Sequence, residues 1–132
     1  MPIGNVWAWP SASVEPADSE RAMKAFAQEV VELFDTYPGF GHPLELEFEI
    51  SAEYDHQAHR VSRMLNIAEP VPALAQLVAA SPVDAALHDA YGRLHKANSF
   101  NTLSKEFCNS DLSAFLDENF AGEYLDLSLI HI

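Results

Sequence analysis

The chain has 132 residues, 48% of them hydrophobic, which is enough for one domain with a modest core. Its 20 acidic and 7 basic residues give a net charge of −13, which repels phosphate backbones and anionic bilayers and therefore argues against nucleic-acid and membrane partners. Cys108 is the only cysteine, so no internal disulfide can form, and a reducing, cytoplasmic location is expected.

The first residues, up to Glu15, are predicted to form an extended segment and a loop, because Pro10 and the neighbouring serines disfavour a helix. Trp7 and Trp9 lie in this segment. Two tryptophans in a loop can line a ligand pocket, and they can equally anchor the loop to the core. Both interpretations remain open for this pair.

Apolar residues at helical spacing predict a helix from about Pro16 to Phe34, which Tyr37-Pro38-Gly39 ends. Residues 44–50 then alternate strictly between apolar residues and glutamate, the period of a strand. Glutamate and leucine are also good helix formers, and a helix is predicted next, over Ala52 to Leu65. Strand and helix both remain open for residues 43–50.

The predicted helix over Ala52 to Leu65 contains Glu53-x-x-His56-x-x-His59. On a helix these side chains lie near one another, and the E-x-x-H spacing occurs in carboxylate-bridged metal sites of helical bundles. Such a site needs matching ligands from other helices, and no second E-x-x-H occurs in the chain. Solvent-facing polar residues are the favoured explanation, because a single short spacing is a weak signal.

A short helix is predicted over Pro72 to Ala80, and a second one begins at Ser81 as N-cap, with Pro82 at its first position. Asp84, three residues after the cap, resembles the acidic member of a capping box. Gly92 inside this helix predicts close packing, because glycine is unfavourable there by about 1 kcal/mol. The helix is predicted to have one apolar face, comprising Val83, Ala86, Leu87, Ala90, Leu94 and Ala97.

Asp84, His88 and His95 lie on one side of the same predicted helix. An aspartate within reach of a histidine can orient it as a general base, and the two can also simply stabilise the helix. No serine or cysteine is framed as a nucleophile by a known motif. Cys108 has no basic neighbour beyond Lys105, so a reactive thiolate is not expected.

The stretch from Ser81 to Leu103 resembles the end of the N-terminal capping domain in the enolase superfamily, in its mandelate racemase/muconate lactonizing enzyme branch. In that branch the helix reads A-[IVF]-D-x-A-L-x-D-x-x-G-[KR]. Lys96-Ala97-Asn98 stands where the family usually has a glycine, and Pro2-Ile3-Gly4-Asn5 stands where it often has G-x-G-E. The positions that match the helix motif and the segment after it are Asp84, Ala86, Leu87, Asp89, Gly92, Arg93, Ser99, Phe100 and Leu103.

The resemblance implies an α+β fold, a partial capping domain that is predominantly helical in this fragment. In the family a three-stranded meander with a helical layer closes over a (β/α) barrel. The barrel carries the Mg²⁺ ligands and the bases that remove a proton α to a carboxylate. The implied parent protein is a racemase, dehydratase or cycloisomerase of a small carboxylate substrate. Trp7 and Trp9 would then belong to the substrate-capping loop, and Ser81, Asp84, Asp89, Gly92 and Arg93 to the structural helix motif.

The resemblance divides the chain into a partial capping domain at 1–103 and a linker toward the barrel at 104–126. Too few residues follow for a barrel of roughly 250 residues, so the barrel domain, the Mg²⁺ ligands and all catalytic residues are expected outside this chain. Residues 127–132, Leu-Ser-Leu-Ile-His-Ile, are what CTG TCT CTT ATA CAC ATC encodes, a string that resembles a transposase-derived sequencing adapter. They are therefore predicted to be translated adapter. A true apolar terminus docked on the core is the alternative.

Two functions remain open at this point. The first is an inactive fragment of a Mg²⁺-dependent enolase-superfamily enzyme. The second is a complete small, acidic, helical protein that binds a partner through its apolar helix faces and has no enzymatic activity.

Overall fold

A computed structural model describes residues 5–126, with side chains from residue 7 onward. The predicted adapter residues 127–132 lie outside the described residues, as do Pro2, Ile3 and Gly4 of the segment compared with G-x-G-E.

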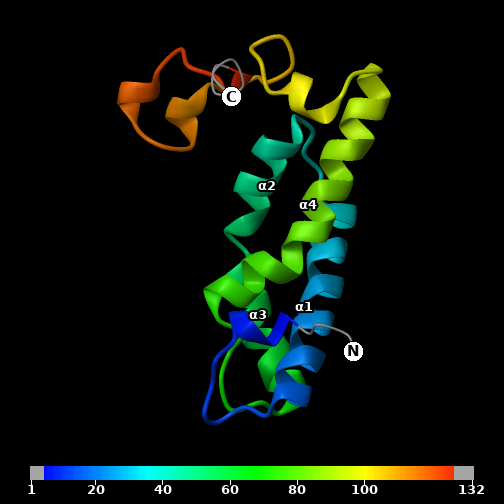
Figure 1. Cartoon of the computed structure of the whole chain (residues 1–132), viewed down its shortest axis with the longest axis vertical. Helices are drawn as coiled ribbons and strands as arrows, with labels where there is room; N and C mark the ends of the chain where they lie inside the picture. The colour runs from blue at the N-terminus through cyan, green and yellow to red at the C-terminus, as the bar shows by residue number, and fades with distance from the viewer. Residues whose placement is uncertain (1–4, 127–132) are drawn as a thin grey trace. The chain divides into compact units, whose positions relative to one another are not determined.

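Every regular element among the described residues is a helix (Figure 1). The predicted α+β class is therefore wrong, because the part of the chain that the structure describes contains no strand and no sheet. The elements are α1 (Pro16–Thr36), α2 (Pro43–Ser51), α3 (Tyr54–Leu65) and α4 (Ala73–His95), with short 3₁₀ turns η1 (Asn5–Ala8), η2 (Ser99–Thr102), η3 (Leu112–Ala114) and η4 (Glu118–Phe120).

Residues 43–50 form helix α2, which settles the choice that the alternating sequence left open. Its start is a capping box in which histidine replaces the usual serine or threonine. The Leu44 N–H donates to His42 Nδ1 (3.1 Å), and the His42 N–H donates to Glu45 Oε2 (2.9 Å). Pro43 occupies the first helical position, where its missing N–H is harmless. These end contacts favour a helix over the strand that the alternation suggests.

Helix α4 runs through Ser81 without a break, so the prediction of an N-cap there is wrong. Pro82 lies inside the helix and cannot donate to the carbonyl of Val78. The Ser81 hydroxyl donates to that carbonyl instead (3.0 Å), which satisfies the acceptor that the proline leaves. Lys96 ends the helix with a φ of 55°, the left-handed conformation that glycine usually supplies at this place.

The chain forms two compact units. Unit 1 comprises residues 1–37 and 50–83, and unit 2 comprises residues 38–49 and 84–132. The division into a partial capping domain at 1–103 and a linker at 104–126, which the resemblance implied, stays a prediction.

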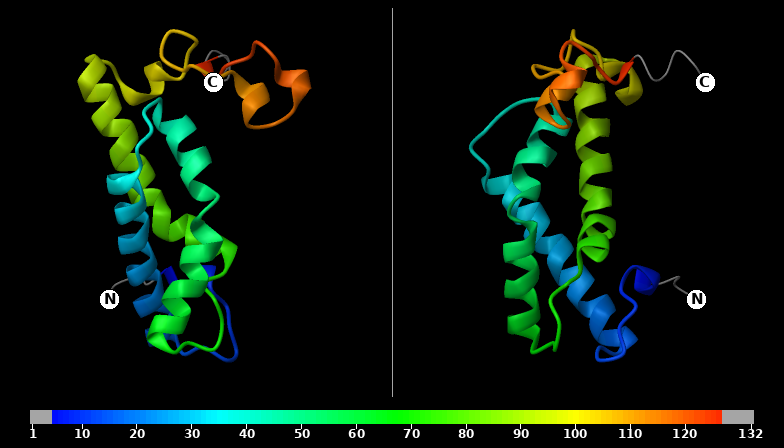
Figure 2. Two further views of the ribbon diagram at one scale, coloured as in Figure 1. Left: turned by 180° about the vertical axis from the view of Figure 1, so that it is seen from behind. Right: turned by 90° about the vertical axis from the view of Figure 1, so that its left-hand side faces the viewer.

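Unit 1 has an apolar core between α1 and α3, which lie side by side (Figures 1 and 2). Phe26 and Val30 of α1 are completely buried, as are Ala58 and Val61 of α3. The ring of Phe26 meets Tyr54 edge to face, with the ring centroids 5.5 Å apart. These buried residues recur at helical spacing, as expected for one apolar face of each helix.

The loop before α1 is fixed to unit 1 by Trp9, which is buried in the core, and by two serines. The hydroxyls of Ser11 and Ser13 both donate to the Glu69 carboxylate. Hydrogen bonds from Ser13, Ser11 and Trp9 lower the pKa of Glu69. The loop is therefore held by one aromatic anchor and one carboxylate.

Unit 2 has an interior of a different kind. Its buried side chains include His42, Thr102 and Cys108. The predicted apolar face of residues 83–97 is not buried here: Leu94 is 76% exposed, and Ala86 and Ala90 are exposed as well. The side of α4 that carries Asp84, His88 and Tyr91 is the more buried one.

Across residues 5–126, none of the helices combines the length and the apolar character needed to cross a bilayer.

Candidate functional site

A cavity of about 440 Å³ lies within unit 2 and has a mostly apolar wall. This volume is within the range of about 300–1,000 Å³ that is usual for small-molecule sites. Helix α4 contributes one wall, and the 3₁₀ turn η2 and the residues beside it contribute another. The apolar lining residues are Leu44, Ala85, Phe100, Leu103 and Leu125, and the polar ones are Asp84, His88 and Ser99.

Asp84 and His88 are the charged and titratable groups of this lining. They stand one helical turn apart on α4, and the His88 Nε2 lies 3.5 Å from Asp84 Oδ1. Both side chains remain partly exposed, 22% for His88 and 42% for Asp84. The sequence predicted that these two residues meet, and the structure places them together at the cavity. The Asp84 carboxylate is a hydrogen-bond acceptor, and the His88 ring can donate or accept a hydrogen bond.

His88 belongs to a group of contacting aromatic rings, here called the ring cluster. Its members are His42, His88, Tyr91, His95 and Phe107. The His42 ring meets His88 with centroids 5.5 Å apart and Tyr91 with centroids 4.9 Å apart, both nearly edge to face. Tyr91 in turn lies against His95, and His95 against Phe107. The Tyr91 hydroxyl donates to the Phe107 carbonyl (3.2 Å). The ring cluster fixes the side of His88 that does not face Asp84.

His42 is the completely buried member of the ring cluster. Burial lowers its pKa most, and His88 lowers it further. Glu45 and the Thr102 carbonyl oppose this lowering, and His95 adds a smaller lowering effect. Because Nδ1 accepts the Leu44 N–H, the neutral ring carries its proton on Nε2. That nitrogen has no hydrogen-bond partner of good geometry among the described residues. A neutral histidine is thus held behind the cavity wall.

Glu45 connects α2 to the loop after η2. Besides the His42 N–H, its carboxylate accepts from the Asn109 amide (2.9 Å) and the Ser110 N–H (2.6 Å). Burial alone would raise the pKa of Glu45, but these hydrogen bonds outweigh it, and the pKa is lowered. Glu45 therefore acts as an ionised structural link rather than as a proton donor.

Cys108 is buried in unit 2, and burial, with smaller effects of Glu45 and Asp126, raises its pKa to about 11. A thiol with this pKa is almost entirely protonated at neutral pH and is a weak nucleophile. This agrees with the prediction that Cys108 is not a reactive thiolate.

The remaining motif residues have structural contacts. Asp89 and Arg93 form an exposed ion pair one turn apart (3.0 Å). Gly92 packs as its position predicts, because a Cβ there would come within 2.9 Å of the Ala97 carbonyl and 3.0 Å of the Ser99 nitrogen. His95 belongs to the ring cluster and not to the cavity wall.

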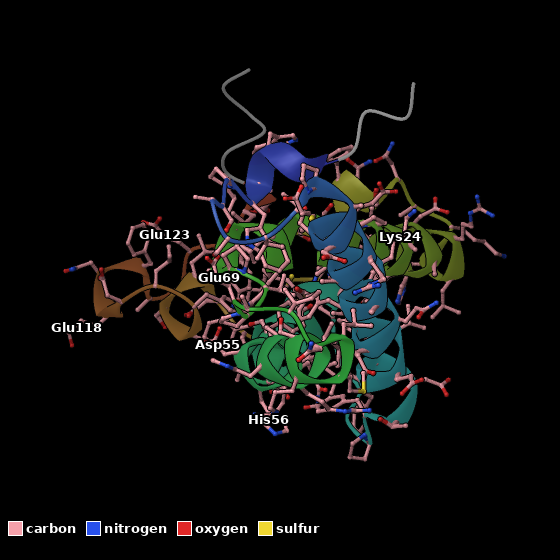
Figure 3. The ribbon with its side chains drawn as sticks, turned by 90° about the horizontal axis from the view of Figure 1, so that it is seen from below. Lys24, Asp55, His56, Glu69, Glu118 and Glu123 are labelled. Carbon is pink, nitrogen blue, oxygen red and sulfur yellow. The ribbon has the colours of Figure 1, made fainter. Side chains whose placement is uncertain are left out.

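The other sequence-predicted groups lie in unit 1. His56 and His59 are exposed on α3, and Figure 3 shows His56 pointing outward. Across the described residues, no three histidine, cysteine or acidic side chains gather in a way that could hold a metal ion, so neither the Glu53 motif nor the Mg²⁺ of the resemblance has a ligand set there. Trp9 is 3% exposed and Trp7 63%, and neither lines a cavity described here.

The helical period alone does not identify His42, Glu45 or Tyr91 as residues of the site. The contacts of His42 with Tyr91 and of Glu45 with Asn109 join segments more than 40 residues apart, which periodicity within one helix cannot detect. The local signal that was present is the capping box: a histidine before proline, with a glutamate three residues later.

Comparisons with protein-family models, with curated proteins and with solved structures give no match. The resemblance to the enolase superfamily and the alternative of a partner-binding helical protein therefore both stay predictions from the sequence.

Proposed function

We propose that unit 2 binds a small, mainly apolar molecule that carries one neutral polar group, such as a hydroxyl. The cavity with a single Asp84–His88 pair in an otherwise largely apolar wall is the observation that carries this proposal. A ligand pocket is commonly apolar, with a few polar groups that fix the orientation of the bound molecule.

The polar end of the cavity favours a hydroxyl. A hydroxyl can donate to the Asp84 carboxylate and accept from a His88 N–H at the same time, since it has one proton and two lone pairs. The apolar body would then lie against Leu44, Leu103 and Phe100.

Charge argues against an anionic ligand. Asp84 is in the wall, no arginine or lysine is among the described residues that line the cavity, and the whole chain carries a net charge of −13. A carboxylate would be repelled by this environment. The proposal therefore differs from the carboxylate substrate that the enolase resemblance implies.

The test is an NMR titration of the full chain with benzyl alcohol and with benzoate, two probes that share an aromatic body. We expect benzyl alcohol to shift the His88 ring signals with a Kd of about 1 mM, which is ordinary for so small a ligand. Benzoate should bind at least tenfold more weakly. Equal binding of the two probes, or stronger binding of benzoate, contradicts the proposal.

A matched pair of variants ties binding to the cavity. Ala85→Leu enlarges a side chain of the cavity wall, while Ala86→Leu makes the same change at the next position of α4, which is outside the cavity lining. Only Ala85→Leu should abolish the benzyl alcohol shifts. If both variants bind like the wild type, the ligand is not in this cavity.

A cytoplasmic location is part of the proposal. It is supported by the single, buried Cys108, which fits a reducing compartment.

A further inference from the structure

A second cavity, of about 380 Å³, lies within unit 1. It is formed by residues 51–55, where α2 ends and α3 begins, and by the first turns of α4. Its polar side chains come from Ser51, Tyr54, Asp55 and Gln76, and its apolar wall from Ala52, Ala73 and Leu77. None of these residues belongs to the cavity of unit 2.

Gln76 holds Asp55 in place at this cavity. Gln76 is 6% exposed, and its side-chain Nε2 donates to the Val71 carbonyl (2.8 Å) and to Asp55 Oδ1 (2.9 Å). The two amide protons are thereby both used, which fixes the orientation of the amide and of the carboxylate that it contacts. A buried amide that is held by the backbone and by one carboxylate keeps that carboxylate in a defined position.

Asp55 retains the capacity to bind a cation. An ionised carboxylate has about four acceptor positions, and the Gln76 amide uses one of them. The Asp55 side chain is exposed (labelled in Figure 3), and no lysine, arginine or histidine is among the described residues that line this cavity. Asp55 is therefore the acidic side chain of the described lining, in a chain with a net charge of −13.

We propose that this cavity binds the protonated amino group of a small alkylamine, with Asp55 as the counter-charge and Gln76 as its positioning residue. The ammonium group donates to the Asp55 carboxylate, and a short alkyl chain contacts Ala73 and Leu77 at the apolar wall. Free amines and lysine side chains of a peptide share this chemistry.

The test is an NMR titration of the full chain with n-butylammonium, followed at the Tyr54 ring and the Gln76 side-chain amide. The same titration with n-butanol removes the charge and keeps the alkyl chain. We expect butylammonium to shift these signals, butanol to shift them much less, and added salt to weaken the effect, because exposed charge pairs are screened.

Two variants remove one negative charge from neighbouring positions. Asp55→Asn should weaken butylammonium binding about threefold or more, in line with an exposed charge pair. Glu53→Gln, two residues earlier and outside the cavity lining, should leave it nearly unchanged. Tryptophan fluorescence checks that both variants fold, since Trp9 is in the core of unit 1.

Equal binding of butanol and butylammonium overturns the proposal. An equal loss of butylammonium affinity in Asp55→Asn and Glu53→Gln overturns it as well. If it stands, a parallel titration with Nα-acetyl-lysinamide identifies the source of the amine. Tighter binding than butylammonium indicates a lysine of a peptide, and weaker binding indicates a free amine. Because the His88 signals of unit 2 are not the reporter, failure here leaves the benzyl alcohol experiment unaffected.

Discussion

The two units differ in what fills their interiors. Unit 1 is held by an apolar core, with Phe26, Val30, Ala58 and Val61 completely buried. Unit 2 buries a histidine and a threonine instead, and uses the Glu45 hydrogen bonds and the ring cluster to hold its segments. An apolar core is stabilised by the area removed from water, whereas a polar interior depends on each hydrogen bond being made. The units should therefore respond differently to mutation and to pH.

The largest effect is expected in the core of unit 1. Phe26→Ala removes a completely buried ring that contacts Tyr54 and should lower the free energy of unfolding by about 3–5 kcal/mol. Urea denaturation followed by tryptophan fluorescence measures this, because both tryptophans belong to unit 1. Val31→Ala on the same helix, at a side chain that is 53% exposed, should change it by less than about 0.5 kcal/mol. Similar losses for both variants would contradict the assigned core.

The corresponding weak point of unit 2 is polar. Glu45→Ala removes the acceptor for His42, Asn109 and Ser110 and should lower the free energy of unfolding by about 2 kcal/mol. The His42 ring signal in NMR reports the unfolding of this unit. Glu106→Ala, at an exposed glutamate of the same unit, is the control and should have little effect. If the two changes cost the same, the Glu45 network does not hold unit 2 together.

Gly92 offers a test with a definite sign. Alanine is a better helix former than glycine by about 1 kcal/mol, so helix propensity alone predicts that Gly92→Ala stabilises α4. The new Cβ would stand 2.9 Å from the Ala97 carbonyl, and backbone atoms cannot move aside easily. A net loss of about 1–2 kcal/mol is expected in urea denaturation. A gain in stability would show that η2 does not pack on α4 as described.

The smallest and most gradual effect is the response to pH. The pKa of His42 is lowered from 6.5 by burial and by its histidine neighbours, so the unfolded chain binds a proton more readily than the folded unit 2. The contribution of His42 to the free energy of unfolding is therefore fully present above about pH 6.5. It declines as the pH falls below that value, by at most about 1.4 kcal/mol per pH unit for one group.

An NMR titration of the His42 ring measures this lowered pKa directly. The His42 signal should titrate below pH 6.5. A His42 ring that titrates at or above pH 6.5 would mean that its interior position is wrong.

The same contrast explains which features the sequence could predict. The buried residues of α1 and α3, Phe26 and Val61 among them, follow the helical period that predicted these two helices. The period also predicted an apolar face with Ala90 and Leu94, but the more buried side of α4 in unit 2 carries His88 and Tyr91. Hydrophobicity does not identify a face that is buried through ring and hydrogen-bond contacts.

Local end effects account for the remaining differences. The alternation of residues 43–50 gave no decision between strand and helix, which the capping box of His42 and Glu45 settles. Ser81 looked like an N-cap because it precedes a proline, yet its hydroxyl satisfies the carbonyl of Val78 and the helix continues. In the candidate site, the i, i+4 spacing predicted the Asp84–His88 pair, whereas Leu44, Leu103 and Leu125 join the cavity through tertiary contacts.

The most direct test of the proposed function is a nuclear Overhauser experiment on benzyl alcohol bound to the isotope-labelled full chain. Cross-peaks from the aromatic protons of the probe to the methyl groups of Leu44 and Leu103, and from its CH₂ group to the His88 ring, are the expected result. Cross-peaks confined to unit 1 would show that the unit 2 cavity is not a ligand site. The absence of cross-peaks at a probe concentration that saturates the chemical-shift changes would show the same.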